Sequence, residues 1–530
     1  MIDLQAQTPG KVIREPAKEL PLVGEYDVLV VGGGMAGVGA AIAAARAGCR
    51  TLMIERESSL GGLATIGLVN IPLDFISGIG GDMMRRLREM DAEWHRNSDP
   101  EKHKLVLDRM VAATGCDLLL VTHAVETIMR GDAVAGVVVE GKSGRQAILA
   151  KRTVDCSGDA DVAHFAGCEY MSGRPGDGMN QACSLEFRLG GVDWDGYVNS
   201  DLKRQDPKWI ELIEKTRGEG WAKIAEIDNH LNWMTHVPGR PEHCGMDEVS
   251  ICFSHSRRCR PLDNRDLTRM YLEGREQADL LWRFIRQNVP GFEKSWLIDT
   301  ATLLGVRETR RVLGEYVITT ADLASGRRFD DVICISGHGY DVHGPDKVGN
   351  IKWDKMVVDG ETRYVICNPG GYGTSWLPPG GKEALSDYWG RKGADIIGRT
   401  VYDIPYRSLV PVKVENLLVA GRCLSADFMA QSGCRLVLAC VNTGEAAGTA
   451  AAISLQHDIA PRKIDRLELQ TTLIRNGCDL GQVKRSANAS GAAYELDGDI
   501  KQATDHGKKP GVDGRRRQEA WRRDIPGVVA

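Results

Sequence analysis

The chain has 530 residues, a formal net charge of −5 at pH 7 and 14 cysteines. This length allows a large buried core and more than one domain, and the mild acidity excludes a basic field that would draw nucleic acid to the whole molecule. No apolar run approaches the roughly 18 residues of a membrane span, and the N-terminus lacks the apolar core of a secretion signal. We therefore expect a cytoplasmic protein with reduced thiols, without a membrane span or a nucleic-acid partner.

The first predicted element is a buried parallel strand at residues 26–31. A glycine-rich turn with the spacing G-x-G-x-x-G follows it, at Gly32, Gly34 and Gly37. These glycines permit a tight turn, close approach of the backbone to a pyrophosphate and close packing of a helix on the strand. A helix of small residues is predicted at 36–47, and its N-terminal end around Met35 and Ala36 would face the phosphates. The segment predicts a dinucleotide site.

The next predicted strand, residues 51–54, ends at Glu55 and Arg56. The Glu55 carboxylate can accept the hydroxyl groups of an adenosine ribose, and it would repel a 2′-phosphate. A second glycine-rich approach follows, at Gly62, Leu63, Ala64 and Thr65. A nicotinamide does not need it, whereas a flavin with its ribityl chain does. We interpret the cofactor as FAD, with a plain surface loop as the alternative for this segment.

Five later segments complete the pattern: VDCSGDADVAHFAG (154–167), LLGVRETRRVLGEY (303–316), YDVHGPD (340–346), IPYRSLVP (404–411) and NLLVAGRCLSADFMAQSGCRLVLACVNTGEAAGTAAA (416–452). Together with the glycine cradle, they resemble a bacterial FAD-dependent oxidoreductase family of the glutathione-reductase-like flavoprotein superfamily. Its relatives would be fumarate-reductase-type and heterodisulfide-reductase-type flavoproteins. The resemblance covers roughly residues 25 to 455 and is specific for the cofactor, while it says little about the substrate.

The resemblance implies an α/β fold, in which a Rossmann-like FAD-binding domain with a β-meander carries an inserted α+β substrate domain. Further cofactor contacts are implied at Val125, Cys156, Ser157, Gly158, Gly421, Arg422, Val437 and Asn442. Val125 lies in the predicted meander, where its backbone would neighbour the adenine. Cys156 and Ser157 replace the Ala-Thr that the family has at this turn, a departure that keeps the small size and one hydroxyl group.

The predicted domains follow the chain in five parts: an N-terminal lead (1–24), the first part of the FAD-binding domain (25–170), the substrate or cap domain (171–401), the second part of the FAD-binding domain (402–460), and a C-terminal helical segment with a polar tail (461–530). In the insert we expect an alternating strand within 181–193 and an amphipathic helix at 266–288. No second strand–G-x-G-x-x-G–helix unit occurs in the insert. Electrons are therefore expected from a small-molecule substrate or from a separate protein donor or acceptor, and a homo-oligomer is left open.

A cluster of potential metal ligands lies at His230, His236, His243, Cys244, Cys252, His255 and Cys259. The spacing is irregular, and no C-x-x-C pair occurs anywhere in the chain. We interpret the cluster as a histidine-rich loop region over the substrate pocket and predict no metal site.

For catalysis we single out His343 as the base, in a glycine-rich loop where it would be exposed and titrate near neutrality, with Tyr340 beside it. Arg407 and Arg435 could clamp a carboxylate, although either could instead tie the two domains together. Arg307, Arg310 and Arg311 are expected on one amphipathic helix, where they would make salt bridges between the domains. The helix that begins near Val437 could stabilise negative charge at the flavin with its positive end.

The favoured function is an FAD-dependent dehydrogenase or oxidase that transfers hydride between flavin and a small polar organic substrate, charged or neutral. A C=C reductase like fumarate reductase is the alternative within the same class. A hydratase or lyase that uses FAD without net redox chemistry is the alternative from another class.

Overall fold

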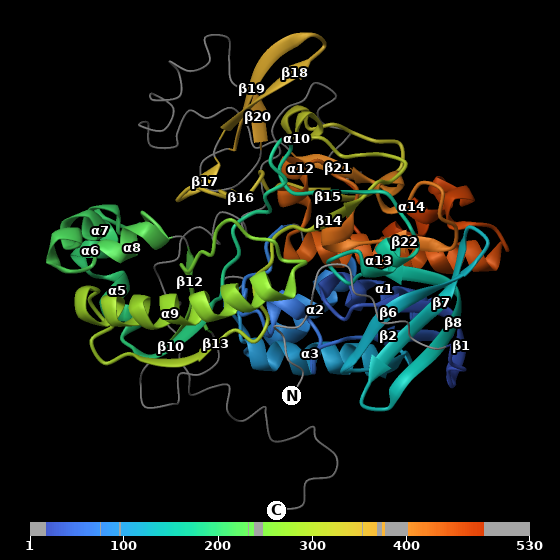
Figure 1. Cartoon of the computed structure of the whole chain (residues 1–530), viewed down its shortest axis with the longest axis horizontal. Helices are drawn as coiled ribbons and strands as arrows, with labels where there is room; N and C mark the ends of the chain where they lie inside the picture. Colours follow the sequence, from blue (N-terminus) through green and yellow to red (C-terminus); the bar gives the residue numbers. More distant parts are fainter. Residues whose placement is uncertain are drawn as a thin grey trace, which may run out of the picture.

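The computed structural model describes residues 17–481 apart from 75, 95–96, 232, 238–246, 352, 368–373 and 377–400. Its centre is a seven-stranded sheet in the order β5-β2-β1-β8-β7-β6, with β22 pairing beside β8. The predicted α/β class is confirmed, and Figure 1 shows this sheet and its helices on the right of the molecule.

The parallel part of the sheet is the Rossmann-like unit that the glycine pattern predicts. Strand β1 (Leu22–Val31) pairs in parallel with β2 (Thr51–Ile54), and β2 pairs with β5 (Asp117–Leu119). Helix α1 (Met35–Arg46) crosses between β1 and β2, and its residues 35–44 are all buried. Apolar strands buried on both faces are what a parallel sheet covered by helices requires.

The β-meander that the resemblance implies is present in the structure. Strands β6 (Thr122–Arg130), β7 (Ala133–Gly141) and β8 (Gly144–Asp155) pair antiparallel in sequence order. The C-terminal half of β8 then runs parallel to β1 and to β22 (Leu417–Val419). The meander is thereby fused to the parallel sheet through one long strand.

Helix α13 (Val437–Gln456) packs on α1 at a distance that only glycine permits. A Cβ atom on Gly444 would lie 1.9 Å from the Ala36 carbonyl oxygen, and one on Gly448 would lie 2.2 Å from that of Ala40. Because the two contacts follow the same order along both helices, α1 and α13 run parallel. Their N-terminal ends therefore lie at the same edge of the sheet, where both positive helix ends are available to anions.

The insert forms a second body on the left of Figure 1. Its four-stranded antiparallel sheet has the order β11-β12-β10-β13, with β11 at Trp233–His236, β12 at Asp247–Cys252, β10 at Phe187–Val192 and β13 at Trp296–Thr300. Helix α9 (Asn264–Asn288) confirms the predicted amphipathic helix. The alternating pattern predicted for 181–193 is wrong, because β10 is buried at every position.

Short helices and small sheets complete the described chain. The helices are α2 (Gly78–Glu89), α3 (Pro100–Ala112), α4 (Asp161–Phe165), α5 (Trp194–Val198), α6 (Asp201–Gln205), α7 (Ile210–Thr216), α8 (Ala222–Ile227), α10 (Thr320–Ser325), α12 (Phe428–Cys434) and α14 (Arg466–Arg475). The strand pairs are β3 (Glu93–Trp94) with β4 (Asn97–Ser98), β9 (Tyr170–Ser172) with β14 (Arg310–Val312), β15 (Val332–Ser336) with β21 (Tyr402–Pro405), and β16 (Val342–His343) with β17 (Asn350–Ile351). A three-stranded sheet contains β18 (Trp353–Val358), β19 (Glu361–Cys367) and β20 (Thr374–Trp376).

Two of the hydrophobic cores show how the central sheet and the insert are divided. One surrounds α1 and α13 and also takes in Ile318, Leu323 and β15, although the sequence places these residues inside the insert. The other fills the space between the four-stranded sheet, α9 and the short helices α5, α7 and α8. The chain segment after α9 therefore returns to the FAD-binding body well before β21.

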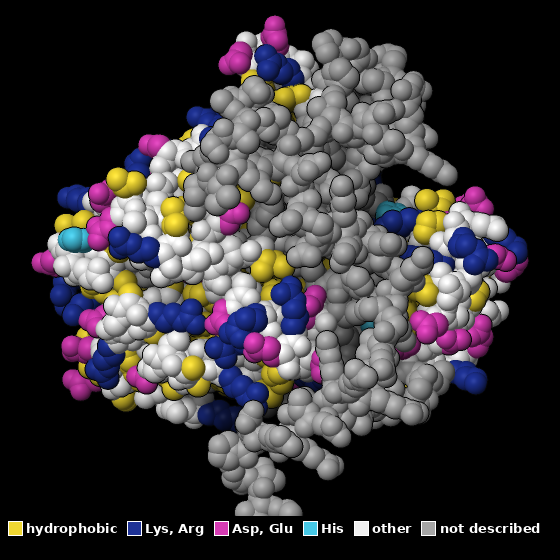
Figure 2. Space-filling view, turned by 180° about the vertical axis from the view of Figure 1, so that it is seen from behind, with side chains coloured by type: hydrophobic (Ala, Val, Ile, Leu, Met, Phe, Trp, Pro, Cys, Tyr) yellow, Lys and Arg dark blue, Asp and Glu magenta, His cyan; other side chains and the backbone are white. Residues whose placement is uncertain are grey.

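The described surface mixes charges of both signs. On the face in Figure 2, basic and acidic side chains alternate over the described part, and neither sign forms a continuous field there. No single described helix is long and apolar enough to span a membrane. Helices α12 and α13 reach that length and composition only as a pair bent by 88°, and α13 is almost wholly buried in the protein.

Candidate active site

The glycine turn after β1 separates into glycines that pack on the chain and one that faces open space. A Cβ atom on Gly32, which has φ of +103°, would lie 2.4 Å from the Cys156 carbonyl oxygen, and one on Gly37 would lie 1.7 Å from that of Gly32. A Cβ atom on Gly34 would meet nothing within 4 Å. The turn thus leaves a cradle at the N-terminus of α1, where a phosphate can approach the backbone.

Glu55 is held at the rim of this cradle by the backbone. The Gly33 N–H donates to Oε2 of Glu55, and the Glu57 N–H donates to Oε1 at 2.7 Å. The carboxylate is therefore fixed at the end of β2, as the predicted contact to a ribose requires.

The second glycine-rich segment lies directly against the first. The Gly61 N–H donates to the Gly33 carbonyl oxygen at 2.9 Å, and a Cβ atom on Gly62 would lie 3.3 Å from Cα of Gly34. A short 3₁₀ helix at Gly62–Ala64 follows, which includes Leu63, and the buried Thr65 hydroxyl donates to the Leu60 carbonyl oxygen at 2.6 Å. The two glycine-rich segments therefore lie side by side.

The end of β8 forms a third wall of the cradle. Cys156 is buried beneath Gly37, and the Ser157 hydroxyl donates to Asp155 at 2.7 Å. Burial raises the pKa of Asp155 to about 6. Gly158 follows with φ of +81°, a left-handed conformation that favours glycine.

The N-terminus of α13 lies at the same edge as the cradle and is not capped by a side chain. Its first turn, from Val437, contains no acidic residue. Several buried polar atoms around it have no hydrogen-bond partner among the described residues: Asn442 Oδ1, Gln431 Oε1, Arg435 Nε and Gln181 Nε2. Buried polar atoms are normally satisfied, so this group indicates a polar ligand at the junction of the two bodies.

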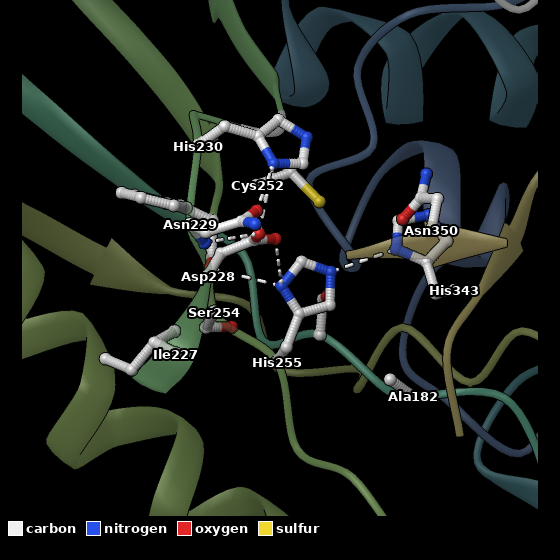
Figure 3. Close-up of polar contacts among 12 residues, drawn as sticks. Ala182, Ile227, Asp228, Asn229, His230, Cys252, Ser254, His255, His343 and Asn350 are labelled. Carbon is white, nitrogen blue, oxygen red and sulfur yellow. Dashed lines mark hydrogen bonds and ion pairs between the residues drawn. The ribbon is translucent and has the colours of Figure 1, made fainter. Parts of the chain in front are cut away.

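His343 lies at the same junction, in a row of ionisable groups. Its Nδ1 is 2.9 Å from Nε2 of His255, and its Nε2 is 3.4 Å from Oδ1 of Asp341. The two imidazole rings are nearly parallel, with an interplanar angle of 24° (Figure 3). Burial, reinforced by Arg307 and opposed by Asp341, lowers the pKa of His343 to about 4. The expected exposure and titration near neutrality are therefore wrong, because the residue lies in β16 under the insert.

Arg435 follows α12 and contacts the other oxygen of the same carboxylate. Its Nη2 is 3.4 Å from Asp341 Oδ2 and donates to the Asp341 carbonyl oxygen at 3.1 Å. Burial lowers the pKa of Arg435 to about 10, although Asp341 opposes the shift. Burial also raises the pKa of Asp341, but His343, Arg435 and His338 outweigh it and hold that pKa well below its ordinary value. At neutral pH the site therefore presents a carboxylate beside a guanidinium.

A sequence model described as FAD dependent oxidoreductase matches residues 27–473. The chain belongs to the FAD-dependent oxidoreductase family. FAD is accordingly its cofactor, as the two glycine segments predict. The open space at Gly34, the fixed Glu55 carboxylate and the unpartnered Asn442 Oδ1 in α13 all fit this dinucleotide.

Two relatives illustrate the range of this oxidoreductase's similarity. Over 239 residues, this chain is 31% identical to the tRNA uridine 5-carboxymethylaminomethyl modification enzyme MnmG of Pelobacter propionicus. The matched region covers 40% of this chain and 37% of that enzyme. Over 221 residues, this chain is 27% identical to a digeranylgeranylglycerophospholipid reductase of Methanospirillum hungatei. The matched region covers 35% of this chain and 52% of that reductase. The chain thus spans about half or less of the length of these curated relatives.

Solved structures show similarity over more of the oxidoreductase chain. A geranylgeranyl bacteriochlorophyll reductase-like protein from Thermoplasma acidophilum covers 92% of this chain and 97% of its own, with a TM-score of 0.40 and 14% identity. The flavin-dependent brominase Bmp2 covers 85% of this chain and 83% of its own, with a TM-score of 0.37 and 12% identity.

In this FAD oxidoreductase, the residues predicted for the adenosine end lie together. Val125 occupies an irregularity of the β6–β7 pairing, where the register shifts between Ala124 and Glu126. An open pocket of about 500 Å³ is lined by Val125, Arg56 and His123, among others. Because Arg56 follows Glu55 directly, this pocket adjoins the rim where a ribose would bind.

Two predicted side chains are engaged elsewhere. Arg422 donates to the Gly158 and Val306 carbonyl oxygens and pairs with Asp159 at 2.8 Å, so its guanidinium joins protein segments. The neighbouring Gly421, with φ of +70°, leaves only its backbone to meet a cofactor. Arg407 donates to the buried Asp331 carboxylate through Nε at 2.9 Å and Nη2 at 3.0 Å. The alternative of a structural arginine therefore fits Arg407 better than a substrate clamp.

Tyr340 faces away from His343. Its hydroxyl donates to the Val365 carbonyl oxygen at 3.3 Å, and its ring belongs to the core beneath β18–β20. Alternating residues of an extended segment point to opposite faces, so Tyr340 and Val342 face this core while Asp341 and His343 face the junction. Tyr340 is not part of the group around His343.

The helix predicted for Arg307, Arg310 and Arg311 does not form. Arg310 and Arg311 lie in β14, which pairs with β9. Arg310 pairs with Asp161 at 3.0 Å, between segments that the sequence assigns to different domains. Arg307 instead donates to the Ala182 carbonyl oxygen at 2.6 Å and to the Ser184 hydroxyl at 3.0 Å. Its charge therefore lies under the His255–His343 pair.

The histidine and cysteine cluster divides between strands and loops. His236 ends β11, Cys252 ends β12, and His255 lies three residues beyond that strand. His243 and Cys244 lie outside the described residues. Within the described residues, no group of three or more potential ligands could hold a metal ion. Sequence reasoning placed His255 in a region over the substrate pocket but not beside His343. It missed Asp341, although Asp341 stands two residues before His343, a spacing that places both on one face of a strand.

A buried glutamate next to Arg307 yields a pH prediction. Burial raises the pKa of Glu186 to about 8, so above pH 4.5 the folded protein retains a proton that the unfolded chain releases. The stabilisation by the retained proton is present in full below pH 4.5, and it is lost as the pH rises from there through about 8. We expect Glu186→Gln, which cannot ionise, to remove this loss of stability, worth roughly 5 kcal/mol at pH 9 because one pKa unit is about 1.4 kcal/mol.

Thermal unfolding between pH 6 and 9 measures this effect. The Tm of the parent should fall more steeply toward alkaline pH than that of Glu186→Gln. Glu276→Gln, on the exposed side of α9, is the matched control and should follow the parent. If Tm depends on pH in the same way in all three proteins, Glu186 ionises normally in the folded protein.

Proposed function

We propose that this FAD-dependent oxidoreductase is a dehydrogenase or oxidase of a small polar substrate that carries a carboxylate. The observation that carries the proposal is Arg435, a buried guanidinium whose Nε has no partner among the described residues, while its Nη2 donates to the Asp341 carbonyl oxygen at 3.1 Å and lies 3.4 Å from Asp341 Oδ2. A planar guanidinium of this kind binds a carboxylate through two parallel hydrogen bonds.

FAD, when bound, supplies the hydride acceptor or donor. Residues Gly32, Gly34, Gly37, Glu55 and the segment Gly62–Thr65 would hold it. The protein's own contribution to catalysis would be made by Arg435, which anchors the substrate, and by His343, which removes a proton from a hydroxyl or amino group. A positioned base of this kind typically contributes about 10²–10⁴-fold in rate.

A C=C reductase is the second candidate, because the same arginine would hold an unsaturated carboxylate. Several relatives that match over part of this chain are named as reductases. In that direction His343 would donate a proton rather than accept one. We keep a hydratase or lyase without net redox chemistry as the outcome that fits if neither direction is observed.

The proposal extends to the electron partner. No second dinucleotide cradle follows the first in the sequence, so a separate protein or a small molecule would complete the redox cycle. A cytoplasmic location and a homo-oligomer also belong to this proposal.

The test is an anaerobic spectral titration of the FAD-loaded protein with a panel of small hydroxy, amino and unsaturated carboxylates and their neutral amides. We expect at least one carboxylate to bleach the oxidised flavin, and its amide to bind far less well. Arg435→Ala should weaken carboxylate binding more than about thirtyfold, since truncating one partner of a desolvated charge pair costs about 2–5 kcal/mol.

Arg407→Ala is the matched control, because it removes a guanidinium that is already paired with Asp331. It should leave carboxylate binding within about twofold of the parent. Equal losses in the two variants would contradict the assignment of Arg435. Reoxidation of the reduced protein by an unsaturated carboxylate would favour the C=C reductase.

A further inference from the structure

A continuous row of side chains connects His343 to the outer face of the insert. Starting from Asp341, the contacts are 3.4 Å to His343, 2.9 Å from His343 to His255, 3.3 Å from His255 to Asp228 and 3.2 Å from Asp228 to His230. Figure 3 shows Asp228 between His230 and His255, with His343 beyond. We call these five residues the histidine row.

The row is buried in the middle and open at both ends. The side chains of His343, His255 and Asp228 are 5%, 2% and 1% exposed. Those of Asp341 and His230 at the two ends are 30% and 22% exposed. A charge moving along the row would therefore enter at the junction that holds Arg435 and leave at His230, without crossing water in between.

The hydrogen-bond partners fix which nitrogen of each histidine in the row donates and which accepts. His255 Nδ1 lies 3.2 Å from the Phe253 carbonyl oxygen, which can only accept, so this nitrogen carries the hydrogen. In the neutral ring Nε2 of His255 is then an acceptor, and Nδ1 of His343 must donate to it. This leaves Nε2 of His343 bare, facing Asp341 and ready to take up a proton.

We propose that the histidine row is a proton relay that carries the substrate's proton from His343 to solvent. The proposal rests on the proposed function, in which the electrons leave with the hydride and only a proton remains to be moved. The proton bonds to Nε2 of His343 as its bond to the substrate breaks. The Nδ1 proton of His343 passes to Nε2 of His255, and the Nδ1 proton of His255 passes to Asp228 Oδ2.

Asp228 is built to receive this proton and to release it. Its Oδ2 is buried, lies 3.3 Å from His255 Nδ1 and has no hydrogen-bond donor among the described residues. Its Oδ1 accepts from the Asn229 N–H at 2.8 Å and contacts His230, which is partly exposed. Proton transfer from Asp228 to water at His230 restores the carboxylate and leaves both rings with hydrogen at Nε2. The resting tautomers return when the electron acceptor of the second half-reaction takes up a proton at the junction, because that proton is drawn back along the same row from His230 to His343.

The surrounding charges keep the proton from resting on either imidazole. Arg307 faces both rings, Arg257 faces His255, and Arg435 and Asp341 face His343. Burial, with His343 and the two arginines, lowers the pKa of His255 well below its ordinary value. A protonated ring is thus a short-lived intermediate, as a relay requires.

The direction of the row can be measured without any substrate. In the FAD-loaded protein labelled with ¹⁵N in its histidine rings, two-bond ¹H–¹⁵N spectra report which nitrogen carries the hydrogen. His255→Gln and His343→Gln identify the two signals by their loss. We expect both rings to be neutral at pH 7 with hydrogen at Nδ1. Hydrogen at Nε2 of His255 would reverse the row and overturn the proposal.

The relay predicts a specific kinetic defect, measured with the carboxylate that bleaches the flavin fastest in the panel. Asp228→Asn and His255→Gln should slow steady-state turnover with a dye acceptor by about tenfold to a hundredfold. They should slow the first anaerobic flavin reduction much less, because His343 still takes one proton. A merely structural defect would slow both phases equally.

His103→Gln is the control, since His103 is also a buried histidine but lies in α3 beside Ser98 and Met83. It should leave the ratio of the two phases unchanged. Steady-state turnover of Asp228→Asn and His255→Gln at the parent rate would overturn the relay while leaving the proposed function intact. If no carboxylate reduces the flavin, the proposed function fails, and the ring spectra still decide the direction of the row.

Discussion

Replacing Gly34 by valine should give a folded protein that purifies without FAD. The backbone at Gly34 has φ of −63°, which valine adopts without strain, and a Cβ atom there meets no protein atom within 4 Å. The side chain would instead fill the space where a pyrophosphate approaches the helix N-terminus. Absorbance between 350 and 500 nm, relative to protein at 280 nm, measures the loss of cofactor, and circular dichroism measures the fold.

Gly37→Ala is the contrasting variant within the same turn. Its Cβ atom would lie 1.7 Å from the Gly32 carbonyl oxygen, so the main chain itself must move. We expect Gly37→Ala to lose stability as well as FAD, whereas Gly34→Val should lose FAD alone.

A Gly34→Val protein that stays yellow with one FAD per chain would show that the pyrophosphate binds elsewhere.

His343→Ala should slow anaerobic flavin reduction by about 10²–10⁴-fold and change carboxylate binding little. Because burial lowers the pKa of His343 to about 4, the base is unprotonated from about pH 5 upward. The parent rate should therefore be flat through neutral pH and fall as the pH drops through about 4, and the variant should lose this limb. Stopped-flow absorbance across pH 3.5–8 measures both effects.

Tyr340→Phe is the matched control for His343→Ala. It removes a hydroxyl group that donates to the Val365 carbonyl oxygen in a separate core, so the reduction rate should stay near that of the parent. Flavin reduction at the parent rate in His343→Ala would exclude His343 as the base, and Asp341 would become the next candidate.

The FAD cradle could be predicted from sequence because its parts are local. The glycine spacing, the small-residue helix and Glu55 follow one another within one β-α-β unit, and each constrains the backbone directly. The group around His343 could not be predicted in the same way. Asp228, His255, Asp341 and Arg435 come from four distant segments, and their contacts depend on how the insert packs on the FAD-binding body.

The errors have equally specific causes. Tyr340 was predicted beside His343 from its nearness in sequence, but an extended backbone places residues three apart on opposite faces. The spacing of Arg307, Arg310 and Arg311 suits a helix. In the structure, however, the preceding Thr302 and Leu303 N–H groups donate to the carbonyl oxygen of Ile66, directly after the second glycine-rich segment. Tertiary hydrogen bonds outweigh helix propensity in such a segment.

The contact between α1 and α13 has a consequence for biosynthesis. Ala36 and Gly444, which pack on each other, are 408 residues apart in the sequence. A nascent chain on the ribosome therefore exposes the small-residue face of α1 until α13 has also been translated. Pairings between such distant segments form late and slowly. We expect cofactor loading to follow the synthesis of α13, and truncated chains that end before α13 to aggregate through that face.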